Sequence, residues 1–402
     1  MKQYIELLNS HTLLRRLSTI QLISYFGAWF SNVAIYTLLI NMEVSASIVG
    51  FVAMLHFLAG VVQAPFSGSI IDSVSPKRLM LILIGVEIIA TISLVFINTI
   101  TDLPFLYILI FFKMAAASFY FTTEMSLLPK VLDGDKLQKA NELHSIIWSI
   151  SYTLGMAISG FVVYIFGIKL AFMLDAMIFV MAFKLLWSLE IDVKMNKVKE
   201  KFLSMMKDTF TYIRSTPKAL HLMLVHSFVG LTAFDALVAL MVDTYYVSVI
   251  ATSLALGLLH SSRAIGLVIG PVILGKWINN KRLIYIFILQ GLSVWLWAYM
   301  MENFYLSLLA SVVVGFFTTT LWSYTYTLLQ KNIEEKYYGR IVAYNDMLFL
   351  SSAAFTSYMI GFLATHDFSL EMIAVIMGVA FMVGGIYYAW VLKKEKIEEI
   401  SV

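Results

Sequence analysis

The chain has 402 residues, of which 60% are hydrophobic and 13% charged, and its net charge is +3. A soluble domain carries about 25% charged residues, so the composition indicates a membrane-embedded protein and excludes an ordinary soluble domain. The absence of Cys excludes disulfides and thiolate metal sites. The cations border apolar segments, which favours membrane topology over nucleic-acid binding as their explanation.

A membrane-spanning helix needs about 20 apolar residues. Apolar runs between charged or turn-rich breaks predict an all-α membrane protein with twelve transmembrane helices. The expected spans are residues 19–40, 47–71, 78–99, 104–128, 143–166, 168–189, 220–246, 252–277, 282–301, 304–328, 341–364 and 370–391.

The distribution of cations predicts the orientation of these spans. Of the 28 Lys and Arg, all but four lie at the N-terminus, in the loops that follow even-numbered spans, or at the C-terminus. The exceptions are Lys113, Lys169, Lys184 and Arg263. Because cations gather on the cytoplasmic side, both termini are predicted to be cytoplasmic. The expected location is the cell (inner) membrane.

The longest break between spans covers residues 190–219 and contains the amphipathic pattern FLSMMKDTFTYIRS. It is interpreted as a cytoplasmic linker with a surface helix, and a lipid-sensing or regulatory element is the alternative. The predicted domains are therefore an N-terminal six-helix half at 1–189, the linker at 190–219 and a C-terminal six-helix half at 220–402.

The stretch 60–78, GVVQAPFSGSIIDSVSPKR, combines a face of small residues with an acid and two terminal cations. Small residues spaced by four allow another helix to approach closely. A second copy, GLVIGPVILGKWINNKR, follows at 266–282. This repetition indicates a duplicated membrane protein.

The stretch 68–78 resembles the loop between helices 2 and 3 of the major facilitator superfamily, through Gly68, Asp72, Lys77 and Arg78. The resemblance implies two pseudo-symmetric six-helix halves that work by alternating access. In that family the loop packs against the start of helix 11. Asp72 is therefore expected to pair with Arg340 and to form a conformational gate that closes the cytoplasmic side.

The stretch 137–179 resembles the macrolide-efflux and enterobactin-exporter branch of the same superfamily. The resemblance rests on Ala140-Asn141, on Gly155 with Gly160, and on Asp175-Ala176. The antiporter motif of helix 5 usually has Gly-Pro at its centre, whereas this chain has Gly155-Met156. The branch implies export of amphipathic compounds of the drug or multidrug type.

Ionisable side chains inside a span cost about 2.5–3.5 kcal/mol at its centre and are expected to face protein or water. Asp235 and Arg263 lie at similar depths on neighbouring spans, which predicts a direct pair. The pair is either structural or part of a substrate or proton site, and both interpretations stay open. His260 precedes Arg263 by three residues and is interpreted as a packing residue.

Lys113 and Glu124 are eleven residues apart, close to three helical turns, so they are expected to point the same way. The resemblance places their helix at the cavity, where Lys113 would attract anionic substrates and Glu124 would lie near the cytoplasmic mouth. A structural pair between Lys113 and Glu87 is the alternative. Asp175 is assigned to a helix that is peripheral in the family.

The expected tenth span carries an unusual number of hydroxyls, so it is expected to line a central cavity together with helix 1. The candidate pathway residues here are Thr319, Tyr324 and Asn32. The stretch Gly270–Lys276 resembles a phosphate-binding loop, but it lies in an apolar helix and is followed by Trp277 instead of Ser or Thr. ATP binding is therefore not expected, and neither a cofactor nor a metal is predicted.

Together these features predict a secondary active transporter and no enzyme. The favoured function is proton-coupled export of amphipathic small molecules, with protons as the coupling ion and a monomer as the expected state. Export of a specific anionic metabolite or siderophore is the first alternative, favoured by Lys113 and Arg263. A polytopic membrane enzyme or sensor is the alternative from another class, but the clustered catalytic groups that an enzyme needs are not found.

Overall fold

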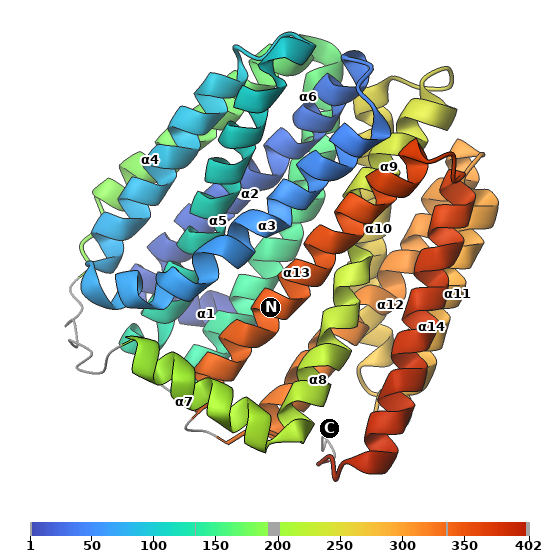
Figure 1. The fold of residues 1–402 in the computed structure, drawn as a ribbon. Coiled ribbons are helices and arrows are strands. Elements are labelled where there is room, and N and C mark those ends of the chain that lie inside the picture. The colour runs from blue at the N-terminus through green and yellow to red at the C-terminus, as the bar shows by residue number, and fades with distance from the viewer. Residues whose placement is uncertain (1, 133, 192–201, 335–336, 399–402) are drawn as a thin grey trace. The chain divides into compact units, whose positions relative to one another are not determined.

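The computed structural model describes residues 2–132, 134–191, 202–334 and 337–398, and within these ranges the chain is helical with no strands (Figure 1). The helices are α1 (Lys2–Ser10), α2 (Thr12–Asn41), α3 (Ala46–Ser73), α4 (Pro76–Leu94), η1 (Ile100–Asp102), α5 (Leu103–Val131), α6 (Gly134–Trp187), α7 (Phe202–Ser215), α8 (Pro217–Ser227), η2 (Phe228–Thr232), α9 (Asp235–Met241), η3 (Val242–Tyr246), α10 (Thr252–Leu274), α11 (Leu283–Met300), α12 (Phe304–Lys331), α13 (Tyr338–Thr365) and α14 (Leu370–Lys394). The predicted all-α fold is confirmed.

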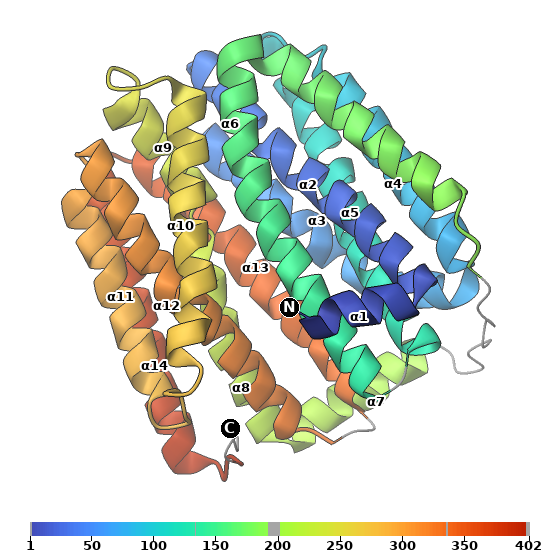
Figure 2. The same ribbon diagram turned by 180° about the vertical axis from the view of Figure 1, so that it is seen from behind.

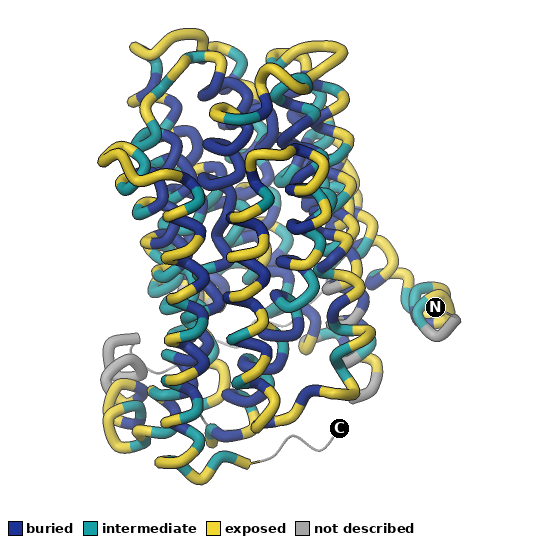
Figure 3. The backbone as a smooth tube through the Cα atoms, turned by 90° about the vertical axis from the view of Figure 1, so that its right-hand side faces the viewer, coloured by how far each residue is buried: buried dark blue, intermediate teal, exposed yellow. Residues whose placement is uncertain are grey.

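The long helices are apolar on their outer faces as well as on their inner ones. Exposed and buried residues alternate along the same helices (Figure 3). Large apolar side chains are exposed, among them Val272 at 79% and Tyr299 at 87%. In water such a surface would be unfavourable, whereas lipid tails are as apolar as these side chains. The exposed faces therefore suit a bilayer.

Ten of the described helical stretches are long and apolar enough to cross a membrane. One of them, Ile146–Trp187, is 42 residues long and belongs to α6, whose helical geometry is interrupted at Gly167 with φ 81°. The remaining helix of suitable length is α4, which has 19 residues and carries Lys77, Arg78 and Glu87. Dividing α6 at Gly167 and adding α4 accommodates the twelve expected spans, and the count itself stays a prediction.

The chain divides into two compact units. The first comprises Met1–Glu43 and Val62–Lys199, and the second comprises Val44–Val61 and Glu200–Val402. The predicted C-terminal half contained only residues 220–402, whereas the second unit also includes the beginning of α3. A cause is the close approach of this segment to α13, where a Cβ added to Gly50 would lie 2.7 Å from the Cα of Gly361.

In the first unit α2 packs along α6, and α4 packs against α5 and α6. In the second unit α10 packs along α12 and α11 lies beside α14, as both ribbon views show (Figures 1 and 2). The helix expected in the linker is α7, and its length matches the amphipathic pattern.

The contact between α10 and α12 depends on glycine. A Cβ on Gly266 or Gly270 would overlap the backbone of α12 at Val312 or Phe316, and one on Gly315 would overlap the Arg263 carbonyl of α10. This confirms the predicted small-residue face at Gly266 and Gly270. It also explains the apparent phosphate-binding loop, because Gly270 is occupied in helix packing and has no free space beside it.

Candidate functional site

The first unit contains a buried ion pair between α5 and α6. Lys113 Nζ lies 3.6 Å from Asp175 Oδ2, and the two side chains are 2% and 0% exposed. The Ser31 hydroxyl of α2 donates to the same Asp175 oxygen, while the ammonium lies 4.9 Å from the ring centre of Phe179. Gly27 leaves room for the carboxylate, because a Cβ there would lie 2.8 Å from Asp175 Oδ1.

Glu87 of α4 adds a second acid to this cluster. It is 2% exposed and interacts electrostatically with both Lys113 and Asp175. The expected alternative pair of Lys113 with Glu87 therefore needs correction, because the direct partner of Lys113 is Asp175. The reason is geometric: α6 brings its carboxylate to the ammonium, whereas α4 places Glu87 farther from it.

A separate polar cluster surrounds Glu124 on the same helix. The Tyr25 hydroxyl donates to Glu124 Oε2 over 3.4 Å, and the ring of His144 meets that of Tyr25 edge-on. His144 also bonds Gln21. Lys113 and Glu124 are both buried, but they belong to different clusters.

The second unit contains a charged cluster at a break in the expected seventh span. Helical geometry ends after η2 and resumes at Asp235, with Ala233 at ψ 71° between them. A break leaves backbone carbonyls without their helical partners. The Arg263 guanidinium donates to the Thr232 carbonyl over 2.9 Å and lies 5.0 Å from the ring centre of Phe234.

The expected direct pair between Asp235 and Arg263 is not what this geometry shows. Asp235 Oδ1 lies 3.7 Å from His260 Nδ1, and Arg263 is engaged by the carbonyl of the break. His260 interacts electrostatically with both charges. The three side chains form one cluster in which His260, expected only to pack, is the partner of the acid. An acid in the first turn of α9 also suits the partial positive charge of a helix start.

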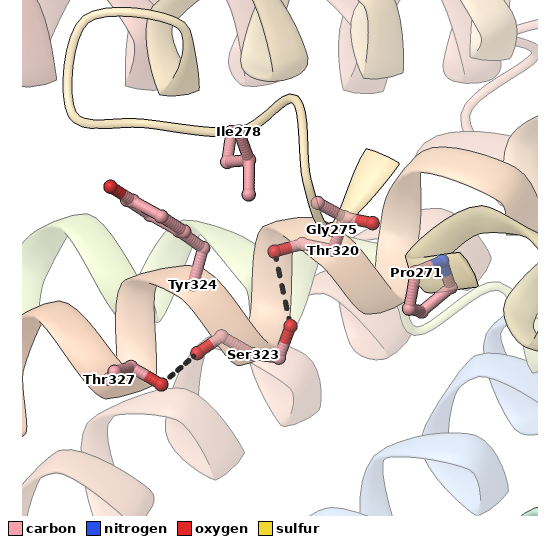
Figure 4. Close-up of a pocket in the computed structure, with 7 residues that line it drawn as sticks. All are labelled: Pro271, Gly275, Ile278, Thr320, Ser323, Tyr324 and Thr327. Carbon is pink, nitrogen blue, oxygen red and sulfur yellow. Dashed lines mark hydrogen bonds between the residues drawn. The ribbon is translucent and has the colours of Figure 1, made fainter. Parts of the chain in front are cut away.

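The hydroxyl-rich helix α12 borders a cavity of about 190 Å³ in the second unit (Figure 4). Its lining residues are Pro271, Gly275, Ile278, Thr320, Ser323, Tyr324 and Thr327. None of them is charged, and four carry hydroxyl groups. This lining can accept an uncharged group that forms hydrogen bonds.

Two hydroxyls of this cavity have contrasting surroundings. The Thr320 hydroxyl is buried and has no hydrogen-bond partner, while Tyr324 donates to Asn280 Oδ1 over 2.7 Å. Asn280 in turn donates to the Glu398 carbonyl. Of the expected pathway residues, Tyr324 therefore borders a cavity, Thr319 is partly buried nearby on α12, and Asn32 is buried within the first unit.

The residues expected to form the conformational gate are only partly described. The side chain of Asp72 and the surroundings of Gly68 lie outside what the structure describes, so the expected contact of Asp72 with Arg340 stays a prediction. Lys77 and Arg78 lie at the start of α4. Arg340 donates to Asp208 of α7 over 3.2 Å.

A further buried group was missed by sequence reasoning. His226 is fully buried and bonds Thr325 over 2.8 Å, within an aromatic group formed by Trp322, Tyr326 and Phe349. A His on an apolar helix gives no signal of such a partner, because Thr325 lies 99 residues away. Among the described residues no group of three or more His, Asp or Glu is placed to hold a metal ion.

The profile of the Major Facilitator Superfamily matches residues 17–256 and 237–401, which together cover most of the chain. The chain belongs to the Major Facilitator Superfamily. Members of this superfamily are transporters, so the chain is a membrane transporter and not an enzyme. Comparison with curated proteins finds no match.

Solved transporters share the fold of this superfamily member at low sequence identity. The nucleoside transporter NupG has a TM-score of 0.72 at 13% identity, covering 96% of this chain and 100% of NupG. A D-xylose-proton symporter has a TM-score of 0.75 at 9% identity, covering 94% of this chain and 97% of the symporter. The POT family transporter PepTSo has a TM-score of 0.69 at 12% identity, covering 94% and 98%.

Proposed function

We propose that this Major Facilitator Superfamily member is a secondary active transporter that exports amphipathic small molecules in exchange for protons. The observation that carries the proposal is the placement of ionisable groups in its apolar helices. Asp175 with Lys113 in the first unit, and Asp235 with His260 in the second, are buried where charge is costly. Such residues in membrane proteins mark ion and proton pathways.

The energy source for transport can be inferred from the binding sites that the helices do and do not offer. The stretch that resembles a phosphate-binding loop is used for packing of α10 on α12, so ATP has no site there. Transport must then use an ion gradient or the gradient of the substrate itself. Carboxylates that can bind and release protons are present inside the spans, which favours a proton gradient.

The preference for amphipathic substrates rests on the cavity at α12. Its hydroxyls can bond a polar group, while Pro271 and Ile278 offer apolar contact. The alternative substrate class, a specific anion, finds less support. Lys113 is paired with Asp175, and the Arg263 guanidinium donates to a carbonyl. Both cations are therefore already engaged within the protein, which disfavours them as binding groups for an anionic substrate.

The export direction and the drug-like substrate class rest on the resemblance at 137–179 to the efflux branch. We further propose that the chain works as a monomer by alternating access in the inner cell membrane, with both termini cytoplasmic. Asp72 and Arg340 are the proposed gate on the cytoplasmic side.

The experiment that tests this function is transport by the purified protein in proteoliposomes with an imposed pH gradient. The panel contains amphipathic cations and neutral compounds, an anionic siderophore, a nucleoside and D-xylose. The proposal expects accumulation of an amphipathic compound opposite to the proton flow. Accumulation in the same direction as protons would show a symporter, and movement unaffected by the pH gradient would exclude proton coupling.

A further inference from the structure

One buried cluster of the first unit holds more negative than positive charge. Glu87, Lys113 and Asp175 come from α4, α5 and α6, and all three are at most 2% exposed. With every group ionised, two carboxylates face one ammonium, so the cluster carries one uncompensated negative charge. Burying such a charge away from water is strongly unfavourable, whereas binding one proton makes the cluster neutral.

The contacts indicate which acid takes that proton. Asp175 is held as the carboxylate by Lys113 at 3.6 Å and by the Ser31 hydroxyl. Glu87 stands outside this ion pair but within electrostatic range of both charges. Protonation of Glu87 therefore leaves the pair intact, while protonation of Asp175 would weaken it.

Among the described residues, the groups that interact with Glu87 from its neighbouring helices add no second cation. Besides Lys113 and Asp175, the neutral Tyr120 of α5 interacts electrostatically with it. Its own helix carries Lys77 and Arg78 only at the start, about 14 Å away along the axis. A purely structural role would require only the neutral pair and would not require Glu87.

We propose that Glu87 is the residue of the first unit that binds and releases the coupling proton, with Lys113 and Asp175 as the fixed pair that positions it. The proposal rests on the proposed proton coupling. Each cycle adds one proton to the Glu87 carboxylate from one side of the membrane and releases it to the other. No other bond forms or breaks.

The transport test compares two assays on Glu87→Gln in proteoliposomes, using whichever compound the wild type transports. Gln mimics the permanently protonated acid, so accumulation driven by a pH gradient should be lost while exchange of labelled for unlabelled compound continues. Glu190→Gln, which removes an exposed carboxylate of the same unit, should retain both activities. Gradient-driven accumulation by Glu87→Gln at the wild-type level would overturn the proposal.

A second measurement works without a known substrate. Infrared difference spectra of the purified wild type between acidic and alkaline pH should show the C=O band of a buried carboxylic acid. Because Glu124 is also buried, part of the band can remain, but the component due to Glu87 should be lost in Glu87→Gln and retained in Glu190→Gln. A band of unchanged size in Glu87→Gln would contradict the assignment.

Charge balance gives a further variant if Glu87→Gln fails to fold. In Asp175→Asn the remaining Glu87 and Lys113 are neutral together, so the cluster no longer needs a proton and the Glu87 component of the infrared band should again disappear. Its persistence would overturn the proposal. The two hypotheses fail separately: a wild type without proton coupling contradicts the proposed function, and a coupled wild type with a coupled Glu87→Gln contradicts only the role of Glu87.

Discussion

The carboxylate of Asp235 lies 3.7 Å from the imidazole of His260, one turn before Arg263 on α10. Residues in contact show coupling free energies of about 0.5–3 kcal/mol in double-mutant cycles. The combination of Asp235→Asn with His260→Asn should therefore be non-additive in chemical unfolding of the detergent-solubilised protein. Additive effects for this pair, together with strong coupling of Asp235→Asn to Arg263→Gln, would instead support a direct interaction between Asp235 and Arg263.

The glycine contact behind this cluster gives a prediction about stability. Gly315→Val should place a side chain against the Arg263 carbonyl and separate α10 from α12, at a cost of about 1–3 kcal/mol or more for overpacking. Gly339→Val is a matched control, since a Cβ there meets nothing within 4 Å. Thermal unfolding in detergent should show a lower midpoint for Gly315→Val alone. Equal midpoints would contradict the close packing.

The cavity at α12 can be tested with isosteric substitutions. Thr320→Val removes a hydroxyl that has no partner, so stability should not fall, while transport of a substrate that bonds this hydroxyl should weaken. Thr318→Val is the control, because its hydroxyl donates to the Val314 carbonyl over 2.9 Å and also lies 3.2 Å from Gln290 Oε1. Its loss should cost about 1 kcal/mol of unfolding free energy. Unchanged apparent affinity in Thr320→Val would exclude this hydroxyl from substrate binding.

The contacts of α7 within the second unit predict that its residues Tyr212 and Asp208 contribute unequally to the free energy of unfolding. The Tyr212 ring stacks on Tyr337 with centroids 4.1 Å apart, and its hydroxyl accepts from the Glu334 amide. Tyr212→Ala should therefore lower the unfolding free energy by about 3 kcal/mol or more. Asp208→Asn, which breaks a partly exposed pair with Arg340, should cost about 1 kcal/mol or less. The reverse order in thermal unfolding would show that the ion pair holds α7.

The sequence predicted the helices, and the small-residue face formed by Gly266 and Gly270, well because these depend on local composition. Runs of apolar residues specify spans. Gly266 and Gly270 are four residues apart, so they lie on one face of their helix whatever the tertiary arrangement. The partners of buried charges were predicted poorly for the opposite reason. Lys113 could reach either Glu87 or Asp175, and only the packing of α6 on α5 and α4 decides between them.

The cluster at Asp235 shows a second limit of sequence reasoning. Depth along a straight helix suggested Arg263 as its partner, but the helix is interrupted between η2 and α9. The interruption supplies a free carbonyl at Thr232, which engages Arg263 and leaves Asp235 to His260. Gly230 lies three residues before Ala233, but the residues at the break itself, Ala233 and Phe234, are neither Pro nor Gly, so the sequence does not mark its position.

The predicted topology has a direct test in this Cys-free chain. Ser45→Cys should react with an impermeant thiol reagent applied outside intact cells, and Ser204→Cys should react only after the membrane is opened. The expectation rests on the cytoplasmic clustering of cations. Labelling of Ser204→Cys from outside would invert the proposed orientation.

The central claim, that buried carboxylates couple transport to protons, is tested most directly by recording proton and substrate fluxes together in one proteoliposome preparation. We expect proton movement opposite to the substrate, dependent on its presence and lost in Glu87→Gln. Substrate movement with no accompanying proton flux in the wild type would contradict the account.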